Sequence, residues 1–339
     1  MVKKLCCVLM MCVLSFCLVG EIFAAEPVSG VAVPRSPKKY SVAGGSIGGN
    51  FYLFGGGIAS VLNKHLPQYF FFTSETTGGG SANLVMLQND EAELGIAMAS
   101  SMYESQRGVA DWTRGKKMTN LRTAVALYPS WMTLYTLKSS GINTMKDLNG
   151  KIVGLGSKGM AMDSIFRQFF EDQGIVPKQI HNDGHGATAT AMQNGIIDAA
   201  LLFSYPPFAA ISELESTKAL NFVALTDKEE SALMKKYDFY TKGEIPVGSY
   251  KAIAKPVRTV TEWNMLVSGS EVPADYVYLI TKTLCENVDD MIKIHGSAKY
   301  ITIQNTLNSN IPLHEGTVRY MREKGINVPD KLLPPEMKK

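Results

Sequence analysis

Residues 44–48 read Gly-Gly-Ser-Ile-Gly and match G-x-S-x-G, the pattern of a serine hydrolase nucleophile elbow. A strand-like run precedes the match and a helix-like run follows it, as that motif requires. The elbow would make Ser46 a nucleophile, followed along the chain by an acid and then a histidine. Too little chain precedes Ser46 for the strands that supply an oxyanion loop, and none of the 5 histidines stands in a recognisable triad context. A secreted serine hydrolase therefore remains only an alternative interpretation.

A second motif, Gly-Leu-Gly-Ser-Lys-Gly at residues 154–159, matches the G-x-G-x-x-G of dinucleotide-binding loops, and Asp183 follows near a strand end. Against this interpretation, the motif lies mid-chain in a small unit, and Met160 and Met162 would crowd a pyrophosphate. A dinucleotide-binding enzyme is thus a second alternative. The sequence carries no P-loop lysine pattern, zinc spacing or calcium loop, so we expect no cofactor and no metal.

Three Gly- or Ser-rich loops share one physical property. They are GGSIGG at 44–49, TTGGGS at 76–81 and GSKGMAM at 156–162, and each is expected to end a strand and open a helix. Free backbone N–H groups and the positive end of the helix dipole gather at such a place, which binds small anions without an arginine. Together the three loops predict a binding cleft rather than a catalytic centre.

The elements that must position these loops repeat as strand, loop and helix, which is typical of a parallel α/β sheet. The expected strands include residues 40–43, 69–74, 94–99, 121–127 and 151–155. We expect two α/β lobes joined by two extended runs, 132–137 and 247–252. The predicted division is a signal peptide at 1–24, a flexible leader at 25–38, lobe 1 at 39–137 with 243–330 returning to it, lobe 2 at 138–242 and a tail at 331–339.

The N-terminus predicts export. A short basic start is followed by an apolar run at residues 5–19, and cleavage is expected near Ala24 and Ala25, which places the mature chain in the periplasm. An uncleaved membrane anchor is the alternative. Four of the 5 cysteines precede that cleavage site, which leaves Cys285 as a buried, inert thiol. The formal charge of +3 gives no reason to expect nucleic acid as a partner, and we expect a monomer.

Ordered stretches over nearly the whole mature chain resemble the TAXI-type solute receptors of tripartite ATP-independent periplasmic (TRAP) transporters. They include SIGGNFYLFGGGIASVLNKHLP, SETTGGGSANLVMLQNDEAELGIAMAS, LYPSWMTLYTLKSSGINTMKDLNGKIVGLGSKGM and IPLHEGTVRYMREKGI. The resemblance implies an α/β, two-lobe, type II periplasmic-binding fold that closes on a small carboxylate or amino acid. It also implies delivery of that solute to a membrane permease driven by an ion gradient. A receptor of the same fold that serves a signalling or ATP-driven system is a further alternative.

The loops and the resemblance together give the predicted ligand-contacting residues. These are Ser46, Gly49, Asn50, Tyr52, Gly79, Gly80, Ser81, Ser100, Ser101, Tyr128, Trp131, Ser157, Lys158, Gly159, Met160, Ser204 and Tyr205. For Tyr128, Trp131 and Tyr205 two interpretations stay open, an aromatic wall in the cleft or packing near the junction of the lobes. Lys158 either fixes a carboxylate or is a solvated loop lysine.

Along the stretches that resemble this family, the sequence departs from the family pattern at three places. Asn50-Phe51 stands where the family has Thr-Tyr, Ser130 stands where an acidic residue is common, and Met160-Ala161-Met162 replaces small polar residues. Fewer hydroxyls and more thioether predict a more apolar cleft than a glutamate receptor would have.

Overall fold

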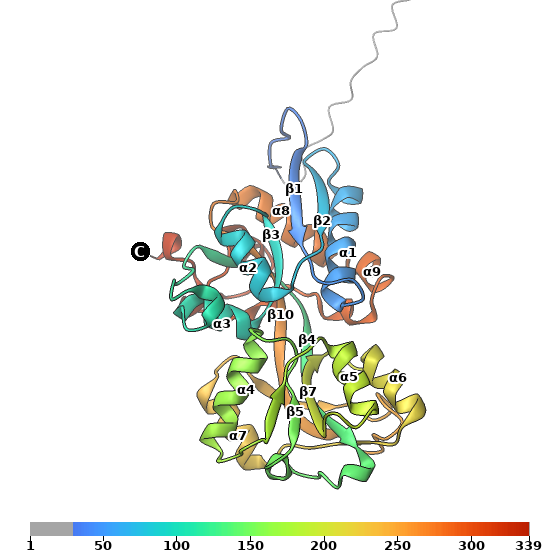
Figure 1. Ribbon diagram of the computed structural model, residues 1–339. Helices are drawn as coiled ribbons and strands as arrows, with labels where there is room; N and C mark the ends of the chain where they lie inside the picture. Colours follow the sequence, from blue (N-terminus) through green and yellow to red (C-terminus); the bar gives the residue numbers. More distant parts are fainter. Residues whose placement is uncertain (1–29, 339) are drawn as a thin grey trace, which may run out of the picture.

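A computed structural model describes residues 30–338 of the protein, so the predicted signal peptide lies outside the described residues. The chain forms two α/β lobes, one above the other in Figure 1. The described residues form one ten-stranded sheet in the order β2-β1-β3-β10-β4-β7-β5-β6, with β8 paired to β4 and β9 paired to β10. The sheet therefore continues from one lobe into the other.

The first lobe contains the N-terminal and C-terminal parts of the chain. Its elements are β1 (Lys38–Ala43), α1 (Asn50–His65), β2 (Phe70–Glu75), α2 (Gly80–Gln88), β3 (Leu94–Met98), α3 (Ala99–Arg107), α8 (Ala274–Glu286), α9 (Val288–Ile292) and α10 (Glu315–Glu323). Strand β1 pairs in parallel with both β2 and β3, as the strand–loop–helix repeat predicts.

The second lobe contains the middle of the chain. Its elements are β5 (Ile152–Gly154), α4 (Ala161–Asp172), β6 (Gln179–His181), α5 (His185–Gln193), β7 (Ala199–Ser204), α6 (Ala209–Thr217), β8 (Leu220–Phe222), α7 (Asp227–Lys236) and β9 (Thr241–Ile245). Strand β5 pairs in parallel with β6 and β7.

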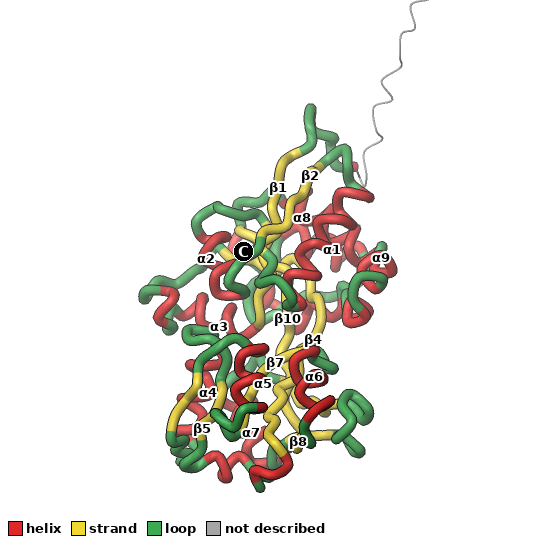
Figure 2. Tube along the Cα trace, turned by 45° about the vertical axis from the view of Figure 1, so that its right-hand side comes forward, coloured by secondary structure: helices red, strands yellow, loops and turns green. Residues whose placement is uncertain are grey.

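Two long antiparallel strands, β4 (Leu121–Leu137) and β10 (Val257–Gly269), connect the lobes (Figure 2). The two strands predicted at 121–127 and 132–137 are one continuous strand that runs through Pro129. The strand predicted at 247–252 is wrong, because those residues form turns after β9. Tyr250 in that segment stacks on Phe222 of β8. Since β8 belongs to the second lobe, the chain is still in the second lobe at Tyr250. The second connection is β10, whose first residues pair with β9.

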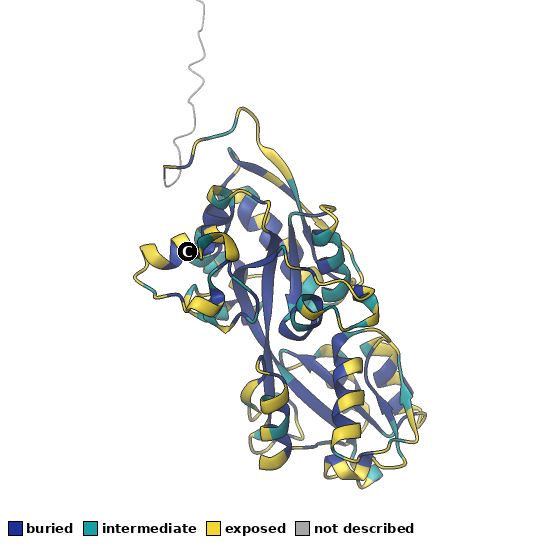
Figure 3. Ribbon diagram, turned by 90° about the vertical axis from the view of Figure 1, so that its left-hand side faces the viewer, coloured by how far each residue is buried: buried dark blue, intermediate teal, exposed yellow. Residues whose placement is uncertain are grey.

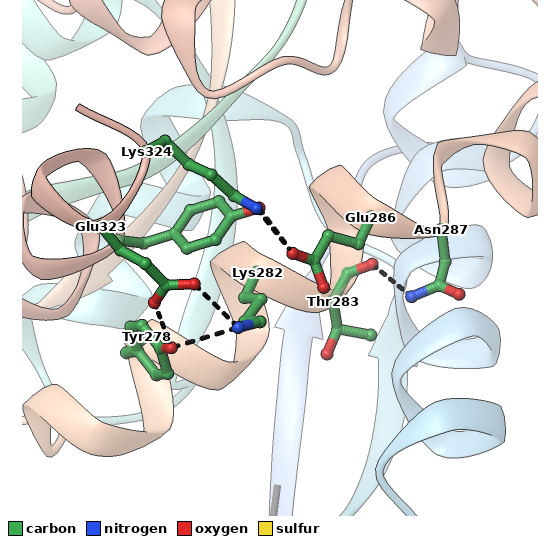
Figure 4. A network of polar contacts seen from close by, with 8 residues as sticks. Tyr278, Lys282, Thr283, Glu286, Asn287, Glu323 and Lys324 are labelled. Carbon is green, nitrogen blue, oxygen red and sulfur yellow. Dashed lines mark hydrogen bonds and ion pairs between the residues drawn. The ribbon is translucent and has the colours of Figure 1, made fainter. Parts of the chain in front are cut away.

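Both faces of the sheet are covered by helices, and the strands at the junction of the lobes are buried (Figure 3). Outside the core, α8 and α10 are joined at the surface by a polar network (Figure 4). Lys282 pairs with Glu323 at 2.9 Å and Lys324 pairs with Glu286 at 3.0 Å. Cys285 on α8 is unpaired, and burial raises the pKa of its thiol to about 12, as expected for an inert thiol.

Within residues 30–338, no helix combines the length and the apolar character that a membrane span needs. The same residues hold no group of three His, Cys, Asp or Glu side chains that could bind a metal ion.

The three consecutive glycines in α1 have different surroundings. A Cβ on Gly55 would lie 3.1 Å from the Gly44 Cα and 2.7 Å from the Ser74 Oγ, whereas a Cβ on Gly56 would meet nothing within 4 Å. Gly55 therefore lets the helix approach the end of β1, where the first glycine-rich loop begins.

These surroundings predict opposite effects for two neighbouring substitutions. Gly55→Ala should lower the free energy of unfolding by about 1–3 kcal/mol, because backbone must move to accept the methyl group. Gly56→Ala should raise it by up to about 1 kcal/mol, since alanine is the better helix former. Urea unfolding of both variants measures this, and equal effects of the two substitutions would contradict it.

Candidate functional site

A cleft of about 770 Å³ lies between the two lobes. Its lining comes from three sources: the glycine-rich loops of the first lobe, the crossing strands, and the loops of the second lobe. The residues are Gly45, Ser46, Ile47, Gly48, Gly49, Asn50, Phe51, Gly78, Gly79, Gly80, Ser81, Ala82, Met98, Ser100, Ser101, Tyr128, Ser130, Asn264, Ser157, Lys158, Gly159, Met160, Ala161, Met162, Gly184, His185, Gly186, Phe203, Ser204, Phe208, Ala209, Ala210 and Glu213.

Five helices begin at this cleft. The N-cap residues of α1, α2, α4, α5 and α6 all line it, and they are Gly49, Gly79, Met160, Gly184 and Phe208. No side chain caps any of the five. Away from the cleft, Thr226 forms a capping box on α7 and His314 caps α10, whereas α8 and α9 also lack a side-chain cap. The cleft therefore gathers several helix N-termini whose first-turn N–H groups have no side-chain acceptor.

A sixth helix shows what such an N-terminus accepts. At the start of α3, the Ser100 N–H donates to the Glu262 carboxylate over 2.8 Å. Glu262 lies on β10 and is only 1 % exposed, and burial raises its pKa to about 7. The protein thus supplies its own carboxyl group to α3. Of the five helices at the cleft, α4 has Asp163 in its first turn, where it pairs with Arg167, and the first turns of the other four hold no acidic side chain.

The two glycine-rich loops of the first lobe are held together by one buried side chain. The Asn83 amide Nδ2 donates to the carbonyl oxygens of Gly44, over 2.6 Å, and of Ile96, over 2.7 Å. Its Oδ1 accepts from the Thr77 hydroxyl over 2.6 Å. Because Gly44 and Thr77 belong to different loops, Asn83 fixes the position of one loop relative to the other. Gly79 has φ of 100°, a backbone conformation open to glycine, where the second loop turns into α2.

Fourteen of the seventeen predicted residues line the cleft, and three lie outside its lining: Tyr52, Trp131 and Tyr205. Trp131 and Tyr205 pack edge to face with ring centroids 5.6 Å apart, and Tyr205 also contacts Tyr300 at 6.1 Å. They form an aromatic cluster at the junction, the second of the two interpretations left open. Tyr128 instead lines the cleft, where burial raises its pKa and Asn50 is hydrogen-bonded to it.

The sequence-based reasoning missed several lining residues. One is His185, the first residue of α5, which lines the cleft. Burial lowers the pKa of its imidazole, which favours the neutral form. Phe208, whose ring lies edge to face with His185 at 5.7 Å, and Asn264 were missed as well. Each is brought to the cleft by long-range packing that no local motif signals.

Charged side chains in the lining are few. Among the described residues that line the cleft, Lys158 and Glu213 carry opposite charges, and arginine is absent. Both are exposed. The electrostatic character of the interior therefore comes mainly from helix N-termini and from neutral polar groups.

A polar contact bridges the lobes beside the cleft. The buried Glu104 carboxylate on α3 accepts from the Ser164 hydroxyl on α4, and from the Trp112 Nε1 over 2.8 Å. Burial raises the pKa of Glu104. This contact joins the lobes in addition to the two strands β4 and β10, as does the packing of Tyr103 on α3 against Tyr237 and Phe239.

A smaller hollow of about 350 Å³ lies apart from the cleft, between the end of β10 and α10. It is lined by Glu271, His314 and Glu336 among others. Three glutamates and no glycine-rich loop line it, so it lacks the features that single out the cleft.

The burial of Glu262 predicts a pH-dependent stability. A carboxyl whose pKa rises from 4.5 to about 7 on folding binds its proton more tightly in the folded state. Its contribution to stability is therefore lost as pH rises from about 4.5 through 7. Glu262→Gln stays neutral and should raise the free energy of unfolding at pH 8 by about 2–3 kcal/mol, with little effect at pH 4.

Urea midpoints at the two pH values measure this effect. Glu244→Gln, on the exposed edge strand β9, serves as the control and should change stability equally at both. A Glu262→Gln effect that is the same at pH 4 and pH 8 would contradict the assignment.

The comparisons with known proteins agree with this architecture. The NMT1-like family matches residues 42–325. A solved structure described as a periplasmic transporter is 15% identical, with 86% of this chain and 93% of that chain covered and a TM-score of 0.51.

Two further solved structures are a putative L-cystine ABC transporter from Listeria monocytogenes and the periplasmic aliphatic sulphonate-binding protein SsuA from Escherichia coli. The first is 17% identical, with 80% of this chain and 99% of that chain covered and a TM-score of 0.46. The second is 14% identical, with 87% and 77% covered and a TM-score of 0.46. At 15% identity and a TM-score of 0.51, the likeness to the periplasmic transporter concerns the fold alone, and it confirms the predicted type II periplasmic-binding architecture. The match over residues 42–325 shows that the chain belongs to the NMT1-like family.

Proposed function

We propose that this protein is an extracytoplasmic solute receptor that binds a small organic anion between its lobes and delivers it to a membrane permease. One observation carries the proposal: five helix N-termini without side-chain caps converge on a single cleft between two lobes. Helix N-termini attract anions through their free N–H groups and the helix dipole. Glu262 at the start of α3 shows that a carboxyl oxygen can accept from the backbone N–H groups of such a helix start.

The rest of the lining indicates the body of the ligand. Met98, Met160, Met162, Phe51 and Phe203 supply apolar surface. A cleft of about 770 Å³ has the size of sites that enclose small organic molecules. We therefore propose a ligand with an anionic group and an apolar portion, in agreement with the substitution of Met160-Ala161-Met162 for small polar residues.

Binding would be coupled to a movement of the lobes. The helix N-termini come from both lobes, so a ligand that contacts N-termini of both draws the lobes together. Because β4 and β10 are paired along the junction, the movement would be a rigid-body rotation about these strands. The contact between Glu104 and Ser164 joins the two lobes and would restrain this movement.

The partner is proposed from the resemblance to TAXI-type receptors, which favours a TRAP permease driven by an ion gradient over an ATP-driven or signalling system. Export to the periplasm is proposed from the N-terminal sequence. Transport of the bound solute into cells that carry the receptor together with a TRAP permease, and its loss when the ion gradient is dissipated, tests this assignment.

A secreted enzyme is the weaker alternative. The Ser46 hydroxyl donates to the Thr77 carbonyl oxygen over 3.3 Å, and no histidine of residues 30–338 forms a hydrogen bond with it. Around the other motif, Gly154 packs against Thr188, where a Cβ would lie 2.7 Å from the Thr188 Cγ2. The glycine there serves contact between strand and helix. Turnover of a model ester that is lost in Ser46→Ala would favour the enzyme.

The primary test combines thermal unfolding with small-angle scattering across a panel of carboxylates, sulfonates and amino acids. An anion at 100 times its Kd should stabilise the protein by about 2.7 kcal/mol and raise Tm by several degrees. The same anion should reduce the radius of gyration. If no anion in the panel produces either change, the receptor assignment fails.

A charge placed at one of the helix N-termini tests the anion directly. Ser81 is in the first turn of α2 and lines the cleft. Ser81→Asp should weaken anion binding at least about tenfold through repulsion, while the ligand-free protein keeps its stability because aspartate is favourable near a helix N-terminus. Titration calorimetry against the best anion of the panel measures the change.

Ser81→Asn is the matched control, since it adds the same bulk without the charge. It should bind the anion markedly more tightly than Ser81→Asp. Equal affinity of the two variants would contradict an anionic ligand at α2.

A further inference from the structure

The floor of the cleft contains an asparagine with an unusual hydrogen-bond state. Asn264 lies on β10, where it pairs with Tyr128 of β4, and it lines the cleft while being only 1 % exposed. Its Nδ2 donates to the Tyr128 carbonyl oxygen over 2.9 Å and to the Ser130 Oγ over 2.8 Å. Its Oδ1 is buried and has no hydrogen-bond partner among the described residues.

The surroundings fix which end of the amide is the oxygen. A backbone carbonyl oxygen only accepts hydrogen bonds, so the atom facing the Tyr128 carbonyl must be the nitrogen. Turning the amide over would place two acceptors against each other. The unpaired atom of Asn264 is therefore an acceptor, and a donor from outside the protein is needed to satisfy it.

A buried acceptor without a donor is unfavourable, and most such groups in folded proteins are paired. Here both donor hydrogens of the same amide are used, which holds the side chain in one orientation. The acceptor is thus held in place at the cleft floor before any ligand arrives. Preorganised polar groups of this kind provide selectivity, because a ligand that lacks the matching group leaves them unpaired.

The groups around Asn264 favour a neutral donor over a cationic one. Tyr128 and Ser130 are hydrogen-bonded to it and also line the cleft, and neither carries a charge, since the pKa of the Tyr128 hydroxyl is raised. The Glu262 side chain, two residues away on the same strand, accepts from the Ser100 N–H, and burial raises its pKa to about 7, which favours its uncharged form. An ammonium group buried at the floor would lack a counter-charge, which is costly, whereas a hydroxyl or an amide N–H needs none.

We infer that Asn264 is a specificity-determining residue whose Oδ1 accepts a hydrogen bond from a hydroxyl or amide N–H of the ligand. The ligand class is then a hydroxylated or amide-bearing organic anion. Simple alkyl acids and amino acids with a free ammonium group at this position are disfavoured. This inference rests on the proposed function, because it assigns one contact within the same cleft.

The test compares matched acids that share one carbon skeleton. Each series holds the unsubstituted carboxylate, its hydroxy isomers at successive carbons and the corresponding amino acids, titrated against the wild-type protein by calorimetry. In the best series, one hydroxy isomer should bind at least about tenfold more tightly than both the unsubstituted acid and its amino counterpart, about 1.4 kcal/mol in binding free energy.

Asn264→Leu then tests the residue. The preference for the hydroxy acid should fall to within about threefold, while the unsubstituted acid keeps its affinity within the same factor. Asn221→Leu, on β8 outside the cleft lining, is the control and should keep the wild-type preference. If Asn264→Leu does not fold, the wild-type ranking still decides the inference.

The outcomes separate the two proposals. Three outcomes overturn the inference alone. The unsubstituted acid binds as tightly as every hydroxy isomer, or the amino acid binds more tightly than the hydroxy acid, or the preference for the hydroxy acid survives in Asn264→Leu. No binding by any acid overturns the proposed function, and the inference with it.

Discussion

The antiparallel pairing of β4 with β10 is the constraint on which the rest of the structure depends. Each strand is long enough to serve both lobes, so one ladder of backbone hydrogen bonds unites the two halves of the sheet. The first lobe places its strand ends and glycine-rich loops against one side of this pair, and the second lobe does the same on the other side. Without the pair, the helix N-termini would not face one another across a cleft.

The functional character of the cleft follows from the absence of side-chain caps on the helices that open onto it. Two helices away from the cleft, α7 and α10, carry caps made by a threonine or a histidine side chain, whereas the five that open onto it begin at glycine, methionine or phenylalanine and carry none. Capping is worth about 1 kcal/mol for a typical helix, so its omission at five sites sacrifices stability. A ligand that supplies the missing acceptors restores that stability when it binds, which couples recognition to closure of the lobes.

Local sequence patterns were sufficient for the glycine-rich loops, because strand, glycines and helix follow one another within about twenty residues. The same reasoning missed β10. Its alternation is interrupted by Glu262 and Asn264, polar residues that are buried because Ser100 and Tyr128 pair with them from distant segments. It also placed Trp131 and Tyr205 in the candidate site, although residue type cannot tell an aromatic wall from an aromatic cluster. Local sequence patterns therefore predicted the glycine-rich loops of the cleft, whereas the floor of the cleft at Asn264 depends on tertiary contacts that they do not encode.

The central claim is that the cleft selects an anion through helix N-termini. Native mass spectrometry of the protein offered a small-molecule extract of cells tests it most directly, since the extract presents anions, cations and neutral compounds in competition. The account predicts that a single small organic acid is retained with one molecule bound per chain and released on denaturation. Retention of a neutral or cationic compound in preference to every acid, or of nothing at all, would contradict it.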